Sequence, residues 1–267
     1  MFRFFRQIRQ SLIMNNKTSK YLKYAIGEIL LVVIGILFAL QINTWNQNRQ
    51  DRIHEQQILK QLLTEYTNNL NQLNQKIDIR NGVLFSCLKI LSYRTTEREY
   101  VDKDSFDLHL SRVITRPTFD PELGITNELT SSGKLYLITS SNLRNEIMSI
   151  PSLFLGELQE EEQVTFNHVE NIFLPFLIEN YQVGPVISQF LNDETFRAKF
   201  TIGETSFNKS FTDLLVPSNF EIVLDHPDLE DHVTLMFSNT TYTNEQSEGV
   251  KNKIEEIIAL IEQEIEN

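Results

Sequence analysis

The feature that most constrains this chain is an apolar run near its N-terminus, from Tyr24 to Trp45 (YAIGEILLVVIGILFALQINTW). Its central residues, 29–40, carry no charge and have mostly branched apolar side chains. As an α-helix the run extends over roughly 33 Å, which is enough to cross a bilayer core of about 30 Å. Tyr24 and Trp45 stand at its two ends, where amphipathic aromatic side chains settle in membrane interfaces. The run therefore predicts a transmembrane helix over residues 24–45.

The charges on either side of this run predict its orientation. Residues 1–27 contain six basic residues and no acidic one, a net charge of +6, whereas residues 28–267 carry −18. Basic segments stay on the cytoplasmic side, so we expect a cytoplasmic N-terminus and a body on the other side of the membrane. A cleaved signal peptide is the alternative. Against it, the basic head (residues 1–23) is long, and Leu37 to Ile42 (LFALQI) contains no small-x-small cleavage site.

The first thirteen residues (MFRFFRQIRQSLI) also have an amphipathic pattern. Their apolar side chains fall on one face at 100° per residue, with arginines beside it. This pattern predicts a short helix that lies on anionic membrane lipid. A basic tail that only sets the topology is the alternative.

One face of the predicted span carries the pattern of a helix contact. Gly35 and Ala39 are four residues apart, and small side chains at this spacing let a second helix approach closely. Glu28 shares their face about one turn inside the cytoplasmic end, where it can serve helix contact or reach the interface. The alternative for Glu28 is a proton-pathway carboxylate, as in single-span stator subunits, although that role favours the midplane. We expect a partner helix or a second copy of the chain on this face.

Residues 46–94 predict a long amphipathic stalk helix, or coiled coil, that continues from the span. Apolar residues recur there at spacings of three and four, at Leu59, Leu63, Tyr66, Leu70, Leu73, Ile77, Leu84, Cys87 and Leu91. Arg80 occupies the one slot where this pattern requires an apolar residue. Leu63, Leu70 and Ile77 are the predicted contact positions on the stalk. Cys87 is expected to be a small buried residue, the alternative being an intermolecular disulfide.

The remaining residues predict a helical middle region, 95–230, and a C-terminal amphipathic helix, 231–267, that packs back on the stalk. The fold class is therefore all-α, an elongated helical bundle. A short strand is the alternative over residues 220–224 (FEIVL), but a lone strand cannot pair its backbone groups, so a short helix is favoured. The local signals are a helix over 121–132 ended by Gly133, an N-cap at Ser140 or Ser141, kinks or breaks at Pro151 and Pro175, and a candidate interruption at Gly249.

The sequence contains no motif that is typical of a catalytic, cofactor-binding or metal-binding site. Phosphate loops, nucleophile elbows, zinc motifs and EF-hands are missing, so we predict no catalytic residue, no cofactor and no metal. In residues 225–232 (DHPDLEDH), Asp225 or His226 is expected to cap a helix that begins at Pro227, and a cation site is the alternative. Glu160, Glu161 and Glu162, with His168, are expected to form a solvated surface rather than a catalytic pair of carboxylates.

The overall charge and the cysteine count exclude other classes of protein. The net charge of −12 argues against a nucleic-acid-binding protein, and a single Cys excludes an intrachain disulfide. No small-molecule substrate is evident from the sequence.

Several stretches carry a resemblance to a known family. These are FRQIRQSL, then KYLKYAIGEILLVVIGILFALQINTWN, and later ELTSSGKLYLITSSNLRNEI and FLPFLIENY. They resemble an uncharacterised family of single-span membrane proteins of Bacteroidota, a domain of unknown function. The resemblance implies an inner-membrane protein with an α-helical periplasmic body, and it assigns no activity.

These patterns together predict a non-enzymatic, single-pass inner-membrane protein. Its helical body is expected to contact a protein partner or a second copy of the chain, as a scaffold or subunit of an envelope assembly. The alternative function is a periplasmic ligand-sensing module that signals through a partner's membrane helices.

Overall fold

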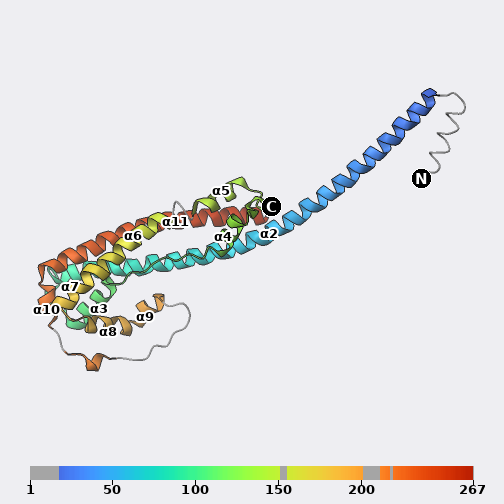
Figure 1. Cartoon of the computed structure of the whole chain (residues 1–267). Helices are drawn as coiled ribbons and strands as arrows, with labels where there is room; N and C mark the ends of the chain where they lie inside the picture. The colour runs from blue at the N-terminus through green and yellow to red at the C-terminus, as the bar shows by residue number, and fades with distance from the viewer. Residues whose placement is uncertain (1–17, 151–154, 201–210, 217–218, 267) are drawn as a thin grey trace. The chain divides into compact units, whose positions relative to one another are not determined.

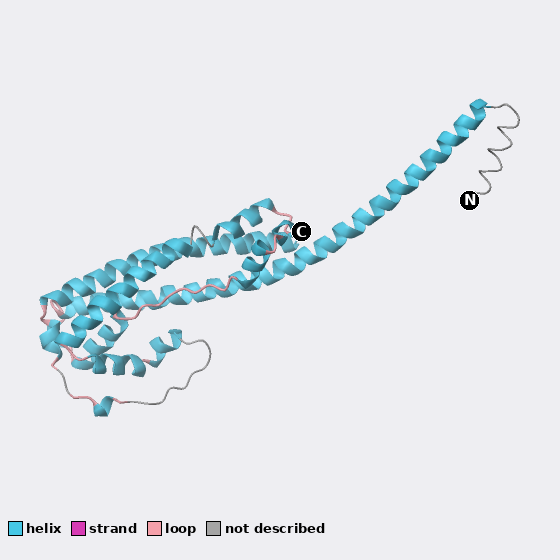
Figure 2. Cartoon of the chain, in the orientation of Figure 1, coloured by secondary structure: helices cyan, strands magenta, loops and turns pink. Residues whose placement is uncertain are grey.

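The computed structural model describes residues 18–150, 155–200, 211–216 and 219–266. Every regular element in these ranges is a helix, and none is a strand (Figure 2). The all-α prediction is therefore confirmed. The amphipathic helix predicted for residues 1–13, most of the basic head and Pro151 lie outside the described residues.

The chain forms two compact units, residues 1–57 and 58–267. Helix α2, Thr18–Tyr93, continues without a break through the division between them. The predicted transmembrane helix, 24–45, and most of the predicted stalk, 46–94, are thus parts of one helix. Its sequence from Tyr24 to Tyr93 contains no proline, and its two glycines near the N-terminal end are tolerated.

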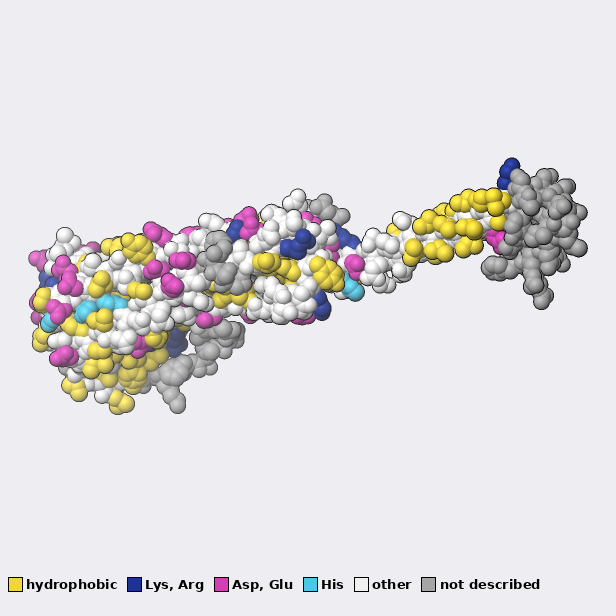
Figure 3. All heavy atoms as spheres, turned by 45° about the horizontal axis from the view of Figure 1, so that its top comes forward, with side chains coloured by type: hydrophobic (Ala, Val, Ile, Leu, Met, Phe, Trp, Pro, Cys, Tyr) yellow, Lys and Arg dark blue, Asp and Glu magenta, His cyan; other side chains and the backbone are white. Residues whose placement is uncertain are grey.

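The described part of the first unit is a helix whose apolar side chains are not covered. All side chains from Ile29 to Gln50 are exposed, and the apolar ones form a continuous hydrophobic surface along the part of the helix nearer the N-terminus (Figure 3). Among the described residues this is the one helix long and apolar enough to cross a membrane, and its most apolar window is 0% buried. A core helix of a soluble protein would be mostly buried, so the segment is a candidate membrane span.

The second unit is a helical bundle built on residues 58–93 of α2. The described helices after α2 are α3 (Lys103–Val113), α4 (Gly124–Ser131), α5 (Ser141–Ser149), α6 (Leu155–His168), α7 (Leu174–Asn180), α8 (Val183–Asn192), α9 (Glu194–Arg197), α10 (Phe220–Leu224) and α11 (Pro227–Glu266), with short 3₁₀ turns at Arg98–Tyr100, Lys134–Leu137, Ala198–Phe200 and Thr212–Leu214. Helix α11 packs along α6 and reaches α5, and α3 packs against α8 (Figure 1). Side chains of α11 also bond to α2, since Asn244 donates to Asn81 at 3.1 Å.

The buried seam of α2 follows a strict heptad. Spacings of three and four alternate through Leu59, Leu62, Tyr66, Asn69, Leu73, Lys76, Arg80, Val83, Cys87 and Ile90, and all of these except Lys76 are buried. The apolar pattern predicted Leu59, Tyr66, Leu73 and Cys87 correctly. It also placed Arg80 on the seam, but elsewhere it chose a neighbouring residue. At 69 and 76 the seam residue is polar and the apolar Leu70 and Ile77 stand beside it; at Leu62, Val83 and Ile90 the following residue is also apolar, and the pattern took the wrong one.

The core of the second unit consists of two hydrophobic clusters. One contains α2 residues from Val83 to Tyr93 with parts of α3, α7, α8, α10 and the first turns of α11. The other contains α2 residues from Leu59 to Leu73 with parts of α4, α5, α6 and the later turns of α11. Helix α2 contributes to both clusters, and Arg80 lies between its two contributions along the sequence.

Several predictions of helix ends and caps in the middle region are confirmed. Gly133 follows Ser132, the C-cap of α4, and its φ of +69° is the left-handed conformation expected where a helix ends. Ser140 caps α5 by accepting a hydrogen bond from the N–H of Leu143. Residues 220–224 are helical, as favoured over a strand. Helix α4 begins at Gly124 rather than at residue 121.

The helix is not broken at either of two predicted positions, Pro175 and Gly249. Pro175 lies in the first turn of α7 and follows a π-helical turn, Val169–Phe173, that joins α6 to α7 without a break. A π-turn shifts the hydrogen-bond register and so accommodates a residue without an N–H. Gly249 lies inside α11, where residues on both sides continue the helix. Helix α11 begins at Pro227, as the capping pattern predicted, although the C-terminal region was placed from residue 231. His226 caps the helix by accepting from the N–H of Asp228 at 3.2 Å.

Candidate functional site

The predicted contact face of the span is open. Gly35 and Ala39 are exposed, and a Cβ added at Gly35 would meet no atom of the described chain within 4 Å. Glu28 is half-buried on the same face. The described chain therefore leaves this face accessible to another molecule, and its role in a helix contact stays a prediction.

The predicted contact positions on the stalk have a different environment. Leu63, Leu70 and Ile77 are partly buried and pack against the hydrophobic cluster of their own chain. Their exposed parts flank the buried seam. Their use in contacts with another chain stays a prediction.

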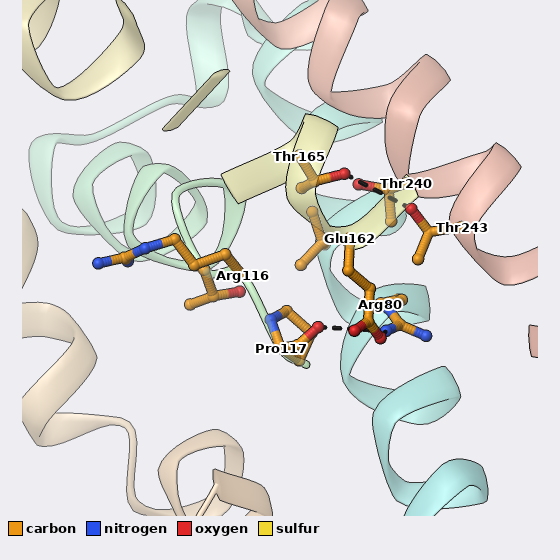
Figure 4. A pocket seen from close by; sticks show the side chains of 9 residues that line it. Arg80, Arg116, Pro117, Glu162, Thr165, Thr240 and Thr243 are labelled. Atoms are coloured by element: carbon orange, nitrogen blue, oxygen red, sulfur yellow. Dashed lines mark hydrogen bonds and ion pairs between the residues drawn. The ribbon is translucent and has the colours of Figure 1, made fainter. Parts of the chain in front are cut away.

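A buried ion pair crosses the middle of the bundle (Figure 4). Arg80 of α2 pairs with Glu162 of α6, and their side chains are 3% and 5% exposed. Arg80 also donates to Ser247 Oγ of α11 at 2.7 Å and to the carbonyl oxygen of Pro117 at 3.1 Å. Glu162 Oε1 accepts the backbone N–H of Phe119 at 3.0 Å. The expectation that Glu162 lies on a solvated surface is therefore wrong, because Arg80 balances its charge in the core.

Burial and mutual attraction act in opposite directions on the pKa of each partner in this pair. Burial raises the pKa of the Glu162 carboxyl, while the Arg80 guanidinium opposes that rise. Burial likewise lowers the pKa of Arg80, against the attraction of Glu162. The cavity beside the pair measures about 10 Å³, which is the room of about one water molecule. No substrate fits there. The pair therefore has a structural role, because it joins α2, α6 and α11 with the loop at Pro117.

The structure brings together three histidines that the sequence left scattered. The His232 ring lies 5.6 Å from the His168 ring and stacks on Phe173 at 5.1 Å. Phe176 contacts both His232 and His226, at 4.7 and 5.0 Å between ring centroids. Sequence spacing gave no signal for this cluster, because His168 and His232 belong to helices that meet only in the tertiary fold.

The histidine cluster has the character of a packed, neutral group. His168 donates from Nε2 to the carbonyl oxygen of His232 at 3.3 Å. Burial lowers the pKa of both His168 and His232. Among the described residues, no group of three or more His, Cys, Asp or Glu is arranged to hold a metal ion. The stretch at 225–232 therefore serves as a helix start in the structure, with His226 as its cap.

Cys87 has the buried position expected of it. Its side chain is 0% exposed and lies in the hydrophobic cluster, where burial raises the pKa of its thiol to about 12. A thiol in this environment is protonated and inert at neutral pH. The alternative of an intermolecular disulfide at Cys87 has no support in this packing.

An apolar cavity of about 460 Å³ opens between α3, α6 and α8. Its walls are apolar at Ile114, Phe166, Val186, Ile187, Phe190 and Phe200. Its polar lining residues are Ser111, Thr115, Thr118 and Arg116. This volume lies within the range of roughly 300–1,000 Å³ typical of small-molecule sites. The sequence did not predict the cavity, because it depends on the packing of three separate helices.

Arg116 is the charged group of this cavity. It extends away from the Arg80 pair (Figure 4). Its guanidinium pairs with Glu170 and lies 5.5 Å from the centroid of the Phe166 ring. Its Nε is buried and has no hydrogen-bond partner among the described residues.

Comparison with known proteins gives a family but no activity. The family model described as a family of unknown function (DUF6090) matches residues 28–161, half of the chain. No curated protein and no solved structure matches.

Proposed function

We propose that this chain, which belongs to the DUF6090 family of unknown function, is a single-pass, membrane-anchored helical protein. It works by contact with a protein partner. The N-terminus lies in the cytoplasm, and the bundle lies in the periplasm, anchored in the inner membrane. The protein is a non-enzymatic scaffold or subunit of an envelope assembly.

The exposed apolar segment of α2 carries this proposal. Its side chains from Ile29 to Leu40 are exposed in the described chain, so nothing in that part of the chain covers them. Lipid is the environment that satisfies such a surface, and a helix satisfies its own backbone hydrogen bonds there. The net charge of +6 on residues 1–27 supports the cytoplasmic N-terminus.

Reporter fusions test the topology. Alkaline phosphatase fused to the C-terminus is expected to be active, and green fluorescent protein fused there is expected to be dark. The reverse result would refute the periplasmic position of the bundle. The intact mass of the mature protein separates an anchor from a signal peptide, since loss of the N-terminal residues together with a soluble product would show cleavage.

Cysteine crosslinking tests the contact in the span. In a Cys87→Ser background, Gly35→Cys is expected to form an adduct with a second copy or with a partner carrying an accessible thiol. Leu37→Cys is the matched control, because at 100° per residue it points to nearly the opposite face of the helix. Equal adduct formation at both positions, or none at either, would count against a contact face at Gly35 and Ala39.

A second candidate function is favoured by the apolar cavity between α3, α6 and α8. A ligand-sensing module needs a site that holds a small molecule, and the cavity has the required volume. Its output would pass through a partner's membrane helices. A ligand that changes the crosslinking yield at Gly35→Cys supports sensing, and one that binds without changing it contradicts sensing.

A further inference from the structure

We propose that the cavity between α3, α6 and α8 binds a small amphipathic anion, a carboxylate with an acyl body of medium length. This inference goes beyond the anchored contact function and does not depend on it. It rests on the volume of the cavity, on its apolar walls and on Arg116 at its lining.

The walls select the apolar body of the ligand. Six of the ten lining residues have large apolar side chains, and three of those are phenylalanines. Phe190 and Phe200 pack with their rings 5.7 Å apart, in an edge-on arrangement that holds this wall together. Ile187 is 43% exposed and Phe166 is 39% exposed, so apolar surface at the cavity is left open to solvent. Filling the cavity with an acyl chain removes this surface from water.

The hydroxyl groups of the lining do not favour a sugar or another polyol. Ser111 Oγ donates to the carbonyl oxygen of Leu108 at 2.8 Å, and Thr115 Oγ1 donates to that of Arg112 at 2.7 Å. Thr118 Oγ1 donates to Asp120 at 3.2 Å. Each hydroxyl has one hydrogen to donate, so the donors of all three are already engaged within the chain. The side chain left to donate to a ligand acceptor is that of Arg116.

Arg116 selects the charge of the ligand. It is the one charged residue among the described residues that line the cavity, and its charge is positive. A guanidinium has five N–H donors, and the pair with Glu170 engages Nη2. The Nε has no partner among the described residues but is buried, so a ligand in the cavity meets the exposed part of the guanidinium, whose side chain is 37% exposed. A carboxylate is the acceptor whose geometry matches two donors of the guanidinium fork.

Photolabelling of the full chain tests this inference. The chain is placed in lipid nanodiscs, because detergents are themselves amphiphiles and compete for an apolar cavity. The probe is a dodecanoate analogue with a diazirine in its acyl chain, and labelled peptides are mapped by mass spectrometry. Labels are expected on lining residues such as Val186, Ile187 and Phe190. Unlabelled dodecanoate is expected to compete, and dodecyltrimethylammonium at the same concentration is not.

Two variants separate charge recognition from apolar partitioning. Arg116→Gln is expected to raise the dodecanoate concentration needed for half-competition about tenfold, and Arg116→Lys is expected to restore part of the affinity. Arg98→Gln is the matched control, since the Arg98 side chain is 36% exposed and paired with Asp225, while that of Arg116 is 37% exposed and paired with Glu170. The control is expected to leave competition unchanged.

Three results would overturn the inference. They are labels confined to α2 of the first unit, equal competition by the anion and the cation, and wild-type competition in an Arg116→Gln variant whose circular dichroism is unchanged. Ile187→Trp gives an independent check, because its added bulk is expected to occupy the cavity and abolish labelling. If the cavity instead receives an apolar segment of a partner protein, dodecanoate fails to compete and the inference is wrong. None of these outcomes alters the reporter test of topology or the crosslinking test at Gly35.

Discussion

Replacing Arg80 with methionine is expected to destabilise the bundle strongly. Methionine keeps much of the volume of the arginine stem but removes the charge that pairs with Glu162. The Glu162 side chain is only 5% exposed, so its carboxylate would remain buried and unbalanced. Removing one partner of a buried pair typically costs about 3–5 kcal/mol. The free energy of unfolding of the bundle should fall by about that amount.

The hydrogen bonds of Arg80 support the upper part of this range. Its side chain also satisfies Ser247 Oγ and the carbonyl oxygen of Pro117, at 2.7 and 3.1 Å. In the variant the Pro117 carbonyl loses this donor, and a buried group left unsatisfied costs about 1–3 kcal/mol. Ser247 is less affected, because its hydroxyl still donates to the carbonyl oxygen of Thr243 at 2.8 Å.

The loss should depend on pH in a defined direction. Burial already raises the pKa of Glu162, and removing Arg80 removes the charge that opposes this rise. A carboxyl whose folded pKa lies above its unfolded value stabilises the fold at low pH, and this contribution is lost as pH rises through the folded pKa. The Arg80→Met variant is therefore expected to be closer to wild type at about pH 5 than at about pH 8.

Thermal unfolding of the full chain in nanodiscs, followed by circular dichroism at 222 nm, measures the effect. The one tryptophan, Trp45, lies in the first unit and does not report on the bundle. At about 2–4 °C per kcal/mol for a domain of this size, the midpoint should fall by roughly 6–20 °C. Lys89→Met is the matched control, since the Lys89–Glu97 pair is 33% and 37% exposed and pairs open to solvent contribute little to stability. Equal effects of Arg80→Met and Lys89→Met would refute the reasoning.

Three further predictions concern stability and reactivity. Gly249→Ala is expected to raise the free energy of unfolding by about 0.5–1 kcal/mol in chemical denaturation, because Gly249 lies inside α11 and its added Cβ meets no atom within 4 Å; Gly82→Ala should lack this gain, since its Cβ would lie 2.8 Å from Phe196 Cε2. Burial lowers the pKa of His109 to about 4, so the fold is expected to lose stability as pH falls below about 6.5, and a His109→Gln variant should lose less between about pH 7 and pH 5. Cys87, with its pKa of about 12, should resist maleimide at neutral pH and react once the bundle is unfolded; rapid labelling of the folded chain would contradict its buried position.

The sequence was sufficient for features that depend on neighbouring residues. The apolar run at 24–45, the left-handed turn at Gly133 and the caps at Ser140 and His226 all follow from local chemistry, and the structure shows a helix or a helix end at each. Gly249 and Pro175 show the limit of such signals. Packing of α11 against α6 maintains the helix through Gly249, and a π-turn accommodates Pro175.

Features that join distant segments were not accessible from the sequence. Arg80 and Glu162 are separated by 82 residues, and His168 and His232 by 64. An isolated charge in an apolar stripe gives no indication of which of 36 acidic residues will balance it. A similar cause displaced part of the predicted seam of α2, because the polar Asn69 is buried there and the apolar Leu70 beside it was taken instead. The cavity at Arg116 likewise depends on how three helices meet.

Arg80, Glu162 and Ser247 form a polar layer in the bundle. Besides stability, this layer contributes to the register in which the helices pack. Most of the bundle is held by apolar side chains, and two heptad-like helices packed only by such side chains can slide past one another by one turn with little change in buried area. A slip of α11 by one turn along α2 would place Thr243 or Val250 where Ser247 now meets Arg80. It would also displace Thr243 from its contact with Thr165 of α6, whose hydroxyl lies 3.5 Å away. Because Arg80 bonds at once to α6, to α11 and to the loop at Pro117, the polar layer penalises every such slip. An Arg80→Met, Glu162→Met double variant should therefore recover part of the stability lost by Arg80→Met alone while losing this selection of register.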